Sequence, residues 1–188
     1  MDDGLDEQRR IADILTEVWG DGGTEELEEA QGRNCMGREV HGGDLRKGRY
    51  SETGRVYLVT AVTEARRTLF VDVGLGREVV HALRHHDLAG DSETLAFVVM
   101  PDHFHWLFAL GERIPLAPLM KSVKSFSARC INRRLGGSGR VWQTSYHDHA
   151  LRRDEDIVQV SRYVVANPLR AGLVERLGDY PLWDAAFL

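Results

Sequence analysis

The chain has 188 residues, of which 43% are hydrophobic and 8% aromatic, and its formal net charge is −5. This length and composition predict a folded protein with a sizeable core. The two cysteines, Cys35 and Cys130, are far apart, which argues against a disulfide framework and indicates a reducing compartment. The longest apolar run, LAFVVMP, is too short to span a bilayer, and the acidic start lacks the layout of a signal peptide. We therefore expect a cytoplasmic protein with no membrane partner.

The N-terminal segment carries most of the negative charge. Residues 1–30 contain eleven acidic and two basic residues, whereas the rest of the chain contains 22 basic and 18 acidic residues. Apolar spacing predicts an amphipathic helix over 5–19 and a short acidic helix over 24–30. A polar, glycine-rich stretch follows. We place a domain boundary near residue 45, so that 1–44 form an acidic extension and 45–188 form the main domain.

From residue 55 onward, the sequence predicts alternating strands and helices. β-branched runs between turn residues predict strands, and apolar residues at three- and four-residue steps predict helices. Asp154 is the expected N-cap of the last helix, and Asn167-Pro168 is expected to stop it. The pattern favours an α+β fold, with an antiparallel sheet and helices packed on one face. The predicted strands cover 55–63, 93–100, 103–110 and 140–151, and the predicted helices cover 75–88, 116–135 and 155–166.

The segment HFHWLFAL places two histidines on one strand. Residues i and i+2 of a strand project to the same face, so His103 and His105 should lie side by side. The opposite face would carry the apolar residues Phe104, Trp106 and Phe108, with Leu110. Two adjacent imidazoles can supply two nitrogen ligands to one divalent ion. Two partly exposed strand histidines without a role remain the alternative.

A second polar group is predicted on the last helix. Gln159, Tyr163 and Asn167 follow one another at four-residue steps and should share one stripe of the helix. The buried side of this helix would carry Ile157, Val160 and Val164. This polar group is a candidate for the third ligand and for the chemistry that a metal site on the two histidines would need. A helical tyrosine that merely packs against its neighbours is the alternative.

Four motifs in this order resemble those of the REP-associated tyrosine transposases, relatives of the single-tyrosine HUH transposases. The motifs are VVMPDHFHWLF, VWQTSYHDHALR, RYVVANPLRAGLV and DYPLW, within a resemblance over about residues 45–185. The resemblance implies a ferredoxin-like or RRM-like sheet with the histidines on a central strand. It further implies Mg²⁺ or Mn²⁺ held by His103, His105 and Asn167, and Tyr163 as the nucleophile on a helix facing the sheet. It gives His149 no defined role.

The activity implied by the resemblance is nicking and rejoining of single-stranded DNA. Tyr163 would attack a phosphodiester, form a 5′-phosphotyrosine and release a 3′-OH. The DNA partner would be a hairpin from repeated extragenic palindromes, with a monomer slightly favoured over a dimer. Two other functions stay open. One is a non-catalytic module of the same fold that binds a DNA or RNA hairpin, and the other is a metal-dependent hydrolase that uses water.

Basic residues of the C-terminal half are the candidates for DNA contacts. Residues 113–170 contain eleven basic and four acidic residues. Such residues can contact phosphates, although each can also be an ordinary solvated charge. Tyr146 is a candidate for stacking on a base. The candidate phosphate contacts are Lys121, Lys124, Arg129, Arg133, Arg134, Arg152 and Arg153.

Overall fold

The structure, a computed structural model, describes residues 52–152 and 155–187. The predicted helices over 5–19 and 24–30 and the predicted boundary near residue 45 lie outside the described residues. None of the described helices is long and apolar enough to cross a membrane.

Five antiparallel strands form one sheet, in the order β4-β1-β3-β2-β5. The first four strands and the two long helices between them follow the β-α-β-β-α-β order of a ferredoxin-like fold. The predicted α+β class and antiparallel sheet are therefore confirmed, and the histidine strand β3 is the central strand. The strands are β1 (Val56–Val62), β2 (Ser92–Met100), β3 (His103–Leu110), β4 (His147–Ala150) and β5 (Trp183–Ala185).

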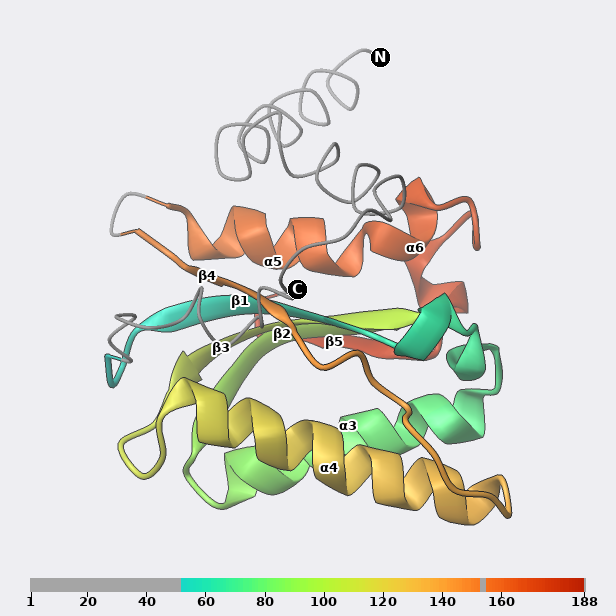
Figure 1. Cartoon of the computed structure of the whole chain (residues 1–188). Helices are drawn as coiled ribbons and strands as arrows, with labels where there is room; N and C mark the ends of the chain where they lie inside the picture. Colours follow the sequence, from blue (N-terminus) through green and yellow to red (C-terminus); the bar gives the residue numbers. More distant parts are fainter. Residues whose placement is uncertain (1–51, 153–154, 188) are drawn as a thin grey trace, which may run out of the picture. The chain divides into compact units, whose positions relative to one another are not determined.

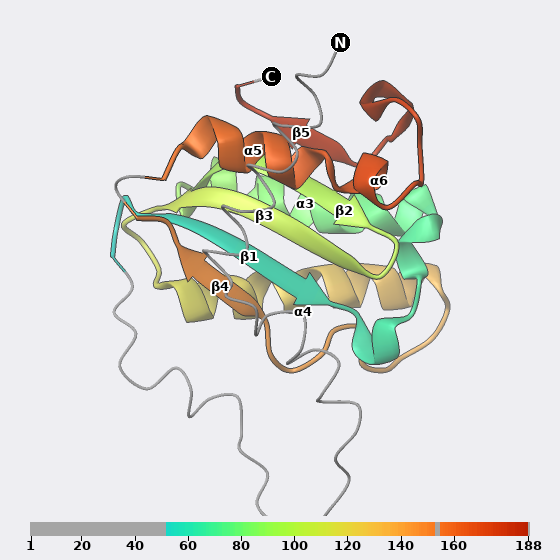
Figure 2. The same cartoon turned by 90° about the horizontal axis from the view of Figure 1, so that it is seen from above.

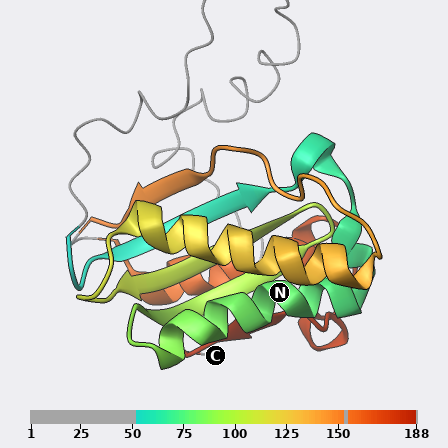
Figure 3. The same cartoon turned by 60° about the horizontal axis from the view of Figure 1, so that its bottom comes forward.

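The helices lie on both faces of this sheet (Figure 1). The long helices α3 (Val73–Leu88) and α4 (Leu116–Arg134) run side by side across one face (Figure 3), as expected. The last helix, α5 (Ile157–Val165), and the short helix α6 (Asn167–Arg170) lie on the other face. The expectation of helices on one face is wrong for α5. Short 3₁₀ turns cover Glu64–Arg66, Leu69–Val71 and Leu177–Asp179.

The larger core lies between the sheet and the helices α3 and α4. Phe104, Trp106 and Phe108 of β3 are fully buried there, as the alternation of the sequence predicts. They pack with apolar side chains of the two helices, including Val79 and Leu119, which are also fully buried. Three aromatic side chains of one strand thus anchor the strand that carries the histidines.

A smaller core explains why α5 packs on the second face of the sheet. Val164 and Val165 of α5 are buried against Leu58, Val98 and Leu107, which project from this face. Helix α5 contacts β2, β5 and β3. Seen from above (Figure 2), α5 lies toward the β2 and β5 side of the sheet, and no described helix covers β1 and β4 there. The described helices therefore cover the histidine face only in part.

The predicted strand over 140–151 is shorter in the structure, where only His147–Ala150 are β4. Residues 140–146 form one isolated bridge, between Thr63 and Trp142, and are otherwise irregular. Lys124 explains part of this difference, because its Nζ binds the carbonyl oxygens of Gln143, Thr144 and Ser145 at 2.6, 3.0 and 3.1 Å. Carbonyls held by an ammonium group are drawn away from the strand ladder.

Helix α5 begins later than predicted. Asp156 is its N-cap, and the carboxylate accepts hydrogen bonds from the backbone N–H groups of Val158 and Gln159. The expected cap, Asp154, lies outside the described residues. The helix ends at Val165, and Pro168 occupies the first turn of α6, where its missing N–H costs nothing.

Candidate functional site

The paired histidines lie on the face of β3 that α5 partly covers. In the strand register His103 lies opposite Val62, and His105 lies between Thr60 of β1 and Val98 of β2. The centroids of the two imidazole rings are 4.8 Å apart, with the rings at 82° to each other. The predicted placement of both imidazoles on one face, opposite the aromatic core, is confirmed.

Both imidazoles are oriented through their Nδ1 atoms. His103 Nδ1 is 2.6 Å from a carboxylate oxygen of Asp102, and His105 Nδ1 is 2.8 Å from the hydroxyl oxygen of Thr60. A carboxylate only accepts, so His103 donates from Nδ1, which leaves Nε2 as the atom that could bind a metal. Nε2 of neither ring has a hydrogen-bond partner among the described residues. This is the arrangement in which outer partners fix imidazoles for metal binding.

Asp102 is itself held by Arg66. Arg66 Nη1 donates to the second carboxylate oxygen of Asp102 at 3.1 Å. Arg66 and Ala65 have left-handed backbone angles, with φ of 50° and 54°, in the turn after β1. Non-glycine residues adopt this conformation only when their surroundings hold it. The hydroxyl of Thr63 donates to the carbonyl oxygens of Arg67 and Asp102, which ties this turn to the start of β3.

Burial, with a smaller contribution from nearby charges, keeps His105 neutral. Burial lowers the pKa of His105 to about 3, with further lowering by the charges of His103 and Arg170. Burial by itself would raise the pKa of Asp102, but the hydrogen bonds and charges of His103 and Arg66 lower it below its usual value. A histidine binds a metal through a neutral imidazole, which is the state of His105, and an ionised carboxylate can accept from His103 and orient it.

Tyr163 is brought to the same face of the sheet by α5. It is partly buried, next to Val164 and Val165, whose packing against the sheet fixes this turn of the helix. The guanidinium carbon of Arg170 lies 4.4 Å from the centroid of the Tyr163 ring. The charge of Arg170 also acts on His105. The helix of the tyrosine therefore packs on the face of the sheet that carries the histidines, although 58 residues separate His105 from Tyr163 in the sequence.

Asn167 closes α5 and starts α6. Its Nδ2 donates to the carbonyl oxygens of Tyr163 and Val164, at 3.2 and 2.9 Å. The amide nitrogen is thus engaged, whereas the amide oxygen, the atom that would bind a metal, has no hydrogen-bond partner among the described residues. The side chain is well suited to be a ligand whose position is fixed by the end of the helix.

The candidate metal ligands are two histidines and one asparagine. They fit a divalent ion only if the asparagine, which is not a His, Cys, Asp or Glu residue, acts as the third ligand. Within 52–152 and 155–187, no group of three such residues is arranged to hold a metal ion. Two imidazole nitrogens and one amide oxygen, completed by solvent or by a phosphate oxygen, form a borderline set that suits Mn²⁺ and is tolerable for Mg²⁺. The metal itself remains a prediction.

Comparison with known proteins identifies the family. Residues 53–167 match the family described as Transposase IS200 like. The chain belongs to the IS200-like transposase family. The matched segment contains both histidines, Tyr163 and Asn167.

The relatives agree with the resemblance in the motifs. A Haemophilus influenzae protein assigned as a REP-associated tyrosine transposase is 30% identical over 102 residues, 47% of this chain and 56% of the relative. The REP-associated tyrosine transposase of Escherichia coli K12 is 29% identical over 91 residues, 47% of this chain and 52% of the relative. The chain thus spans about half the length of these curated relatives. The predicted resemblance is confirmed.

A solved structure supports the fold. The structure of a REP-associated tyrosine transposase bound to a REP hairpin superposes with a TM-score of 0.59 at 22% identity. The alignment covers 79% of this chain and 82% of that structure. At this level of identity, the likeness establishes the fold of this IS200-like transposase.

The structure separates most predicted DNA-contacting residues from the histidines. Lys121, Arg129 and Arg133 project from α4 into solvent, on the other side of the sheet from the histidines. Arg134 pairs with Glu78 at 2.5 Å, and Lys124 binds the three carbonyls described above. Arg152 is exposed, and Arg153 lies outside the described residues. Each remains a predicted DNA contact, but they do not converge on one point.

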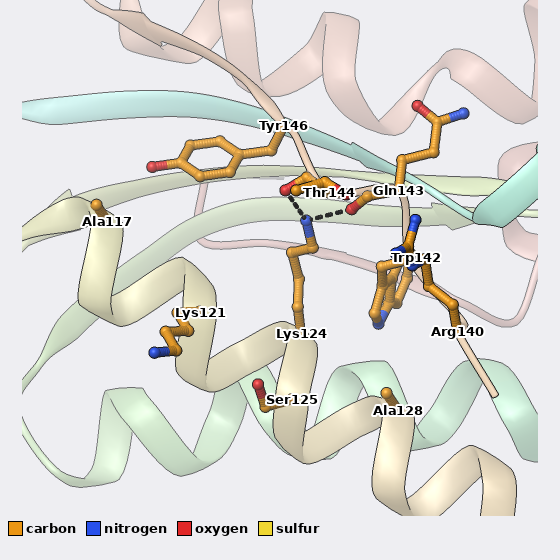
Figure 4. Close-up of a pocket in the computed structure, with 10 residues that line it drawn as sticks. All are labelled: Ala117, Lys121, Lys124, Ser125, Ala128, Arg140, Trp142, Gln143, Thr144 and Tyr146. Atoms are coloured by element: carbon orange, nitrogen blue, oxygen red, sulfur yellow. Dashed lines mark hydrogen bonds between the residues drawn. The ribbon is translucent and has the colours of Figure 1, made fainter. Parts of the chain in front are cut away.

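A pocket of about 330 Å³ lies between α4 and residues 140–146 (Figure 4). Lys121 and Lys124 line it from the helix, and Arg140 and Tyr146 line it from the facing segment. Tyr146 is only partly exposed, because it packs against the larger core. The prediction of Tyr146 as a base-stacking residue therefore concerns the part of its ring that faces this pocket.

His149 has a partner that the sequence could not indicate. Its Nε2 lies 3.0 Å from the carboxylate of Glu155, which also accepts from the backbone N–H of Arg152. The pair connects β4 to the residues that lead into α5. We therefore interpret His149 as a residue that positions the start of α5.

Sequence reasoning missed four residues around the histidines: Thr60, Arg66, Asp102 and Arg170. Asp102 had a signal, because a carboxylate beside a candidate ligand histidine is a common orienting group. Thr60 required the strand register, and Arg66 required the left-handed turn. Arg170 follows Asn167 by three residues, which would have placed it on the same side of a continuing helix.

Proposed function

We propose that this transposase is an endonuclease and strand transferase for single-stranded DNA that acts on REP-type hairpins through a 5′-phosphotyrosine at Tyr163. The main support is the packing of α5 onto the face of the sheet that carries His103 and His105. A nucleophile and a candidate ligand pair, far apart in the sequence, thereby share one face of the sheet. The family and its REP-associated relatives support the same chemistry.

Each residue has a defined task in this proposal. His103, His105 and Asn167 would hold Mg²⁺ or Mn²⁺, which would neutralise charge on the scissile phosphate. The Tyr163 oxygen attacks phosphorus while the bond to the 3′ oxygen breaks. The phenol loses its proton, and the departing oxygen gains one and becomes a free 3′-OH. Attack by a 3′-OH on the phosphotyrosine reverses the step, so that rejoining needs no external energy source.

The packing of α5 also supports a monomeric active site. Tyr163 belongs to a helix that packs on the sheet of its own chain. A second subunit is therefore not required to bring the tyrosine to the histidines. Light scattering of the protein at the concentration used for cleavage would test this, because a monomer should be the cleaving species.

The function is tested with a labelled single-stranded REP-type hairpin that carries its 5′ flanking sequence. In the presence of Mn²⁺, we expect a covalent protein–DNA adduct that resists denaturation and disappears with EDTA. Tight binding without any adduct would instead support a non-catalytic module that binds hairpins. Cleavage without an adduct that survives loss of Tyr163, but not of His105, would support a hydrolase that uses water.

A further inference from the structure

Arg170 contacts the ring of the candidate nucleophile from the short helix α6, and this helix contacts β2, the neighbour of the histidine strand. Arg170 follows Asn167 by three residues and Tyr163 by seven, which are spacings of one helix face. The helical path continues across the break between α5 and α6, because Ala166 has φ and ψ of −76° and −5°. The polar stripe that the sequence predicts therefore extends one position further, to an arginine.

The guanidinium of Arg170 is held by an aromatic ring and, within the part of the chain that the structure describes, is not neutralised by a carboxylate. It lies over the ring of Tyr163, 4.4 Å from the centroid, and a cation over an aromatic face is held by the charge distribution of the ring. No carboxylate among the described residues pairs with it, and no described residue accepts a hydrogen bond from its side chain. Arg170 is also exposed. As far as residues 52–152 and 155–187 are concerned, its N–H donors can therefore reach an external anion.

The same charge is felt at the histidines. After burial and the charge of His103, Arg170 is the next cause that lowers the pKa of His105. Helix α6, which carries Arg170, contacts β2, the strand paired with the histidine strand β3, so the contact with Tyr163 and the strands of the ligand pair meet at this helix. An anion in this place would be bound by the guanidinium of Arg170 and by the ion that the ligand pair would hold. A phosphodiester has this charge, and its two non-bridging oxygens match the planar fork of a guanidinium.

We propose that Arg170 is a phosphate-binding catalytic residue that contacts the non-bridging oxygens of the scissile phosphodiester during attack by Tyr163. This inference rests on the proposed function. Contact with the ring of Tyr163 orients the guanidinium before DNA arrives. Charge that accumulates on the phosphoryl oxygens in the transition state is then met by donors already in place.

The test compares Arg170→Gln and Arg170→Lys with the wild-type protein in single-turnover cleavage of the labelled hairpin. Arg170→Gln should lower the cleavage rate by about 100-fold or more, the size expected for a lost donor to a transition-state oxyanion. Arg170→Lys keeps the charge but loses the fork, so it should recover part of the rate. The matched control is Arg176→Gln, which removes an exposed arginine that pairs with Asp179 in the loop after α6.

Three further measurements separate a catalytic role from a structural one. Binding of the hairpin in EDTA and the melting temperature should change little in Arg170→Gln. Guanidinium ion, added at non-denaturing concentrations, should restore part of the rate in Arg170→Ala and should not affect Arg176→Gln. Absence of an adduct with wild-type protein would refute the proposed function. A normal rate in Arg170→Gln alongside a wild-type adduct would overturn only this inference, as would a loss of rate in Arg170→Gln and Arg170→Lys that is explained by unfolding of these two variants.

Discussion

Successive residues of β3 meet two different surroundings. Phe104, Trp106 and Phe108 are fully buried beneath α3 and α4, whereas His103 and His105 are only partly buried on the face that α5 covers in part. The face beneath α3 and α4 supplies apolar contact area. The face that carries the histidines supplies polar atoms with defined orientations. Alternate residues of β3 should therefore affect different quantities. Substitutions of the aromatic residues should lower the free energy of unfolding, and substitutions of the histidines should lower the cleavage rate.

The largest expected effect is at Tyr163. Tyr163→Phe removes the attacking oxygen and keeps the ring, so the covalent adduct should fall by about 1,000-fold or more, below detection in a denaturing gel. Tyr180→Phe is the matched control. Its hydroxyl donates to the Val99 carbonyl at 2.7 Å and belongs to the support of the sheet. An adduct that persists in Tyr163→Phe would assign the nucleophile elsewhere.

Two neighbouring substitutions test the difference between the faces directly. Trp106→Ala should lower the free energy of unfolding by about 3–5 kcal/mol, because it empties a fully buried site. His105→Ala should abolish metal-dependent cleavage while changing the free energy of unfolding by about 1 kcal/mol or less. Urea denaturation and the hairpin assay measure the two quantities. Equal stability losses at both positions would contradict the separation of roles.

The neutral state of His105 predicts a specific pH dependence. Its pKa is about 3 in the folded protein and 6.5 in the unfolded chain, so the unfolded chain binds the proton more tightly. Its contribution to stability is therefore complete above pH 6.5 and is lost as the pH falls toward 3. The slope from this group approaches about 1.4 kcal/mol per pH unit at most.

The control for this pH dependence is His105→Asn. The amide can replace Nδ1 toward Thr60 but does not titrate. Metal-free wild-type protein should lose stability relative to this variant between pH 6.5 and 3, as followed by urea denaturation at each pH. Parallel pH profiles would show that His105 is not the cause.

Lys124 provides a test on the other side of the sheet. Lys124→Met keeps most of the aliphatic stem but releases the carbonyls of residues 143–145. The free energy of unfolding should fall by about 1–3 kcal/mol, the range for hydrogen bonds to a charged group. Hydrogen exchange should rise in residues 140–146 and remain unchanged in β3. Increased exchange in β3 would show that the two faces are coupled.

The smallest expected effect is at the start of α5. Asp156→Ala removes the cap and should cost about 1 kcal/mol of stability. Because α5 carries Tyr163, cleavage should also fall, by a few-fold, while Asp156→Asn should restore both quantities. Denaturation and single-turnover cleavage, measured on the same preparations, provide the comparison. A loss of stability without any change in cleavage would mean that α5 is held at Tyr163 by its packing alone.

How much could be predicted from the sequence depended on how local each feature is. The bounds of β3 and the opposite faces of its histidines and aromatics follow from period-two alternation, which needs no distant partner. The observed strand β4 is shorter than the strand predicted over 140–151, in part because the carbonyls of residues 143–145 bind Lys124. Lys124 precedes Gln143 by 19 residues, so this contact is not a local feature of the strand sequence. Helix α5 was predicted, but its face of the sheet was not, because that depends on a second apolar surface of the sheet.

The same reasoning applies to the candidate site. The histidines, Tyr163 and Asn167 were found from spacing and motif resemblance. Arg66 was not, because its contact with Asp102 joins residues 36 positions apart through a left-handed turn. Arg170 lay within a quoted motif but carried no chemical signal until its contact with the tyrosine ring was known.

The short strand β5 affects whether the sheet can pair with the sheet of another molecule in solution. It pairs with β2 through Ala185, Asp184 and Trp183, so that β2 does not end the sheet. A strand that ends a sheet offers a row of free amide and carbonyl groups to any other chain. Without residues 180–187, β2 would become an exposed edge strand. We would then expect the protein to aggregate, because other chains could pair with this edge. These few residues thus protect the edge of β2 from pairing with another molecule. They are remote in sequence from the paired histidines.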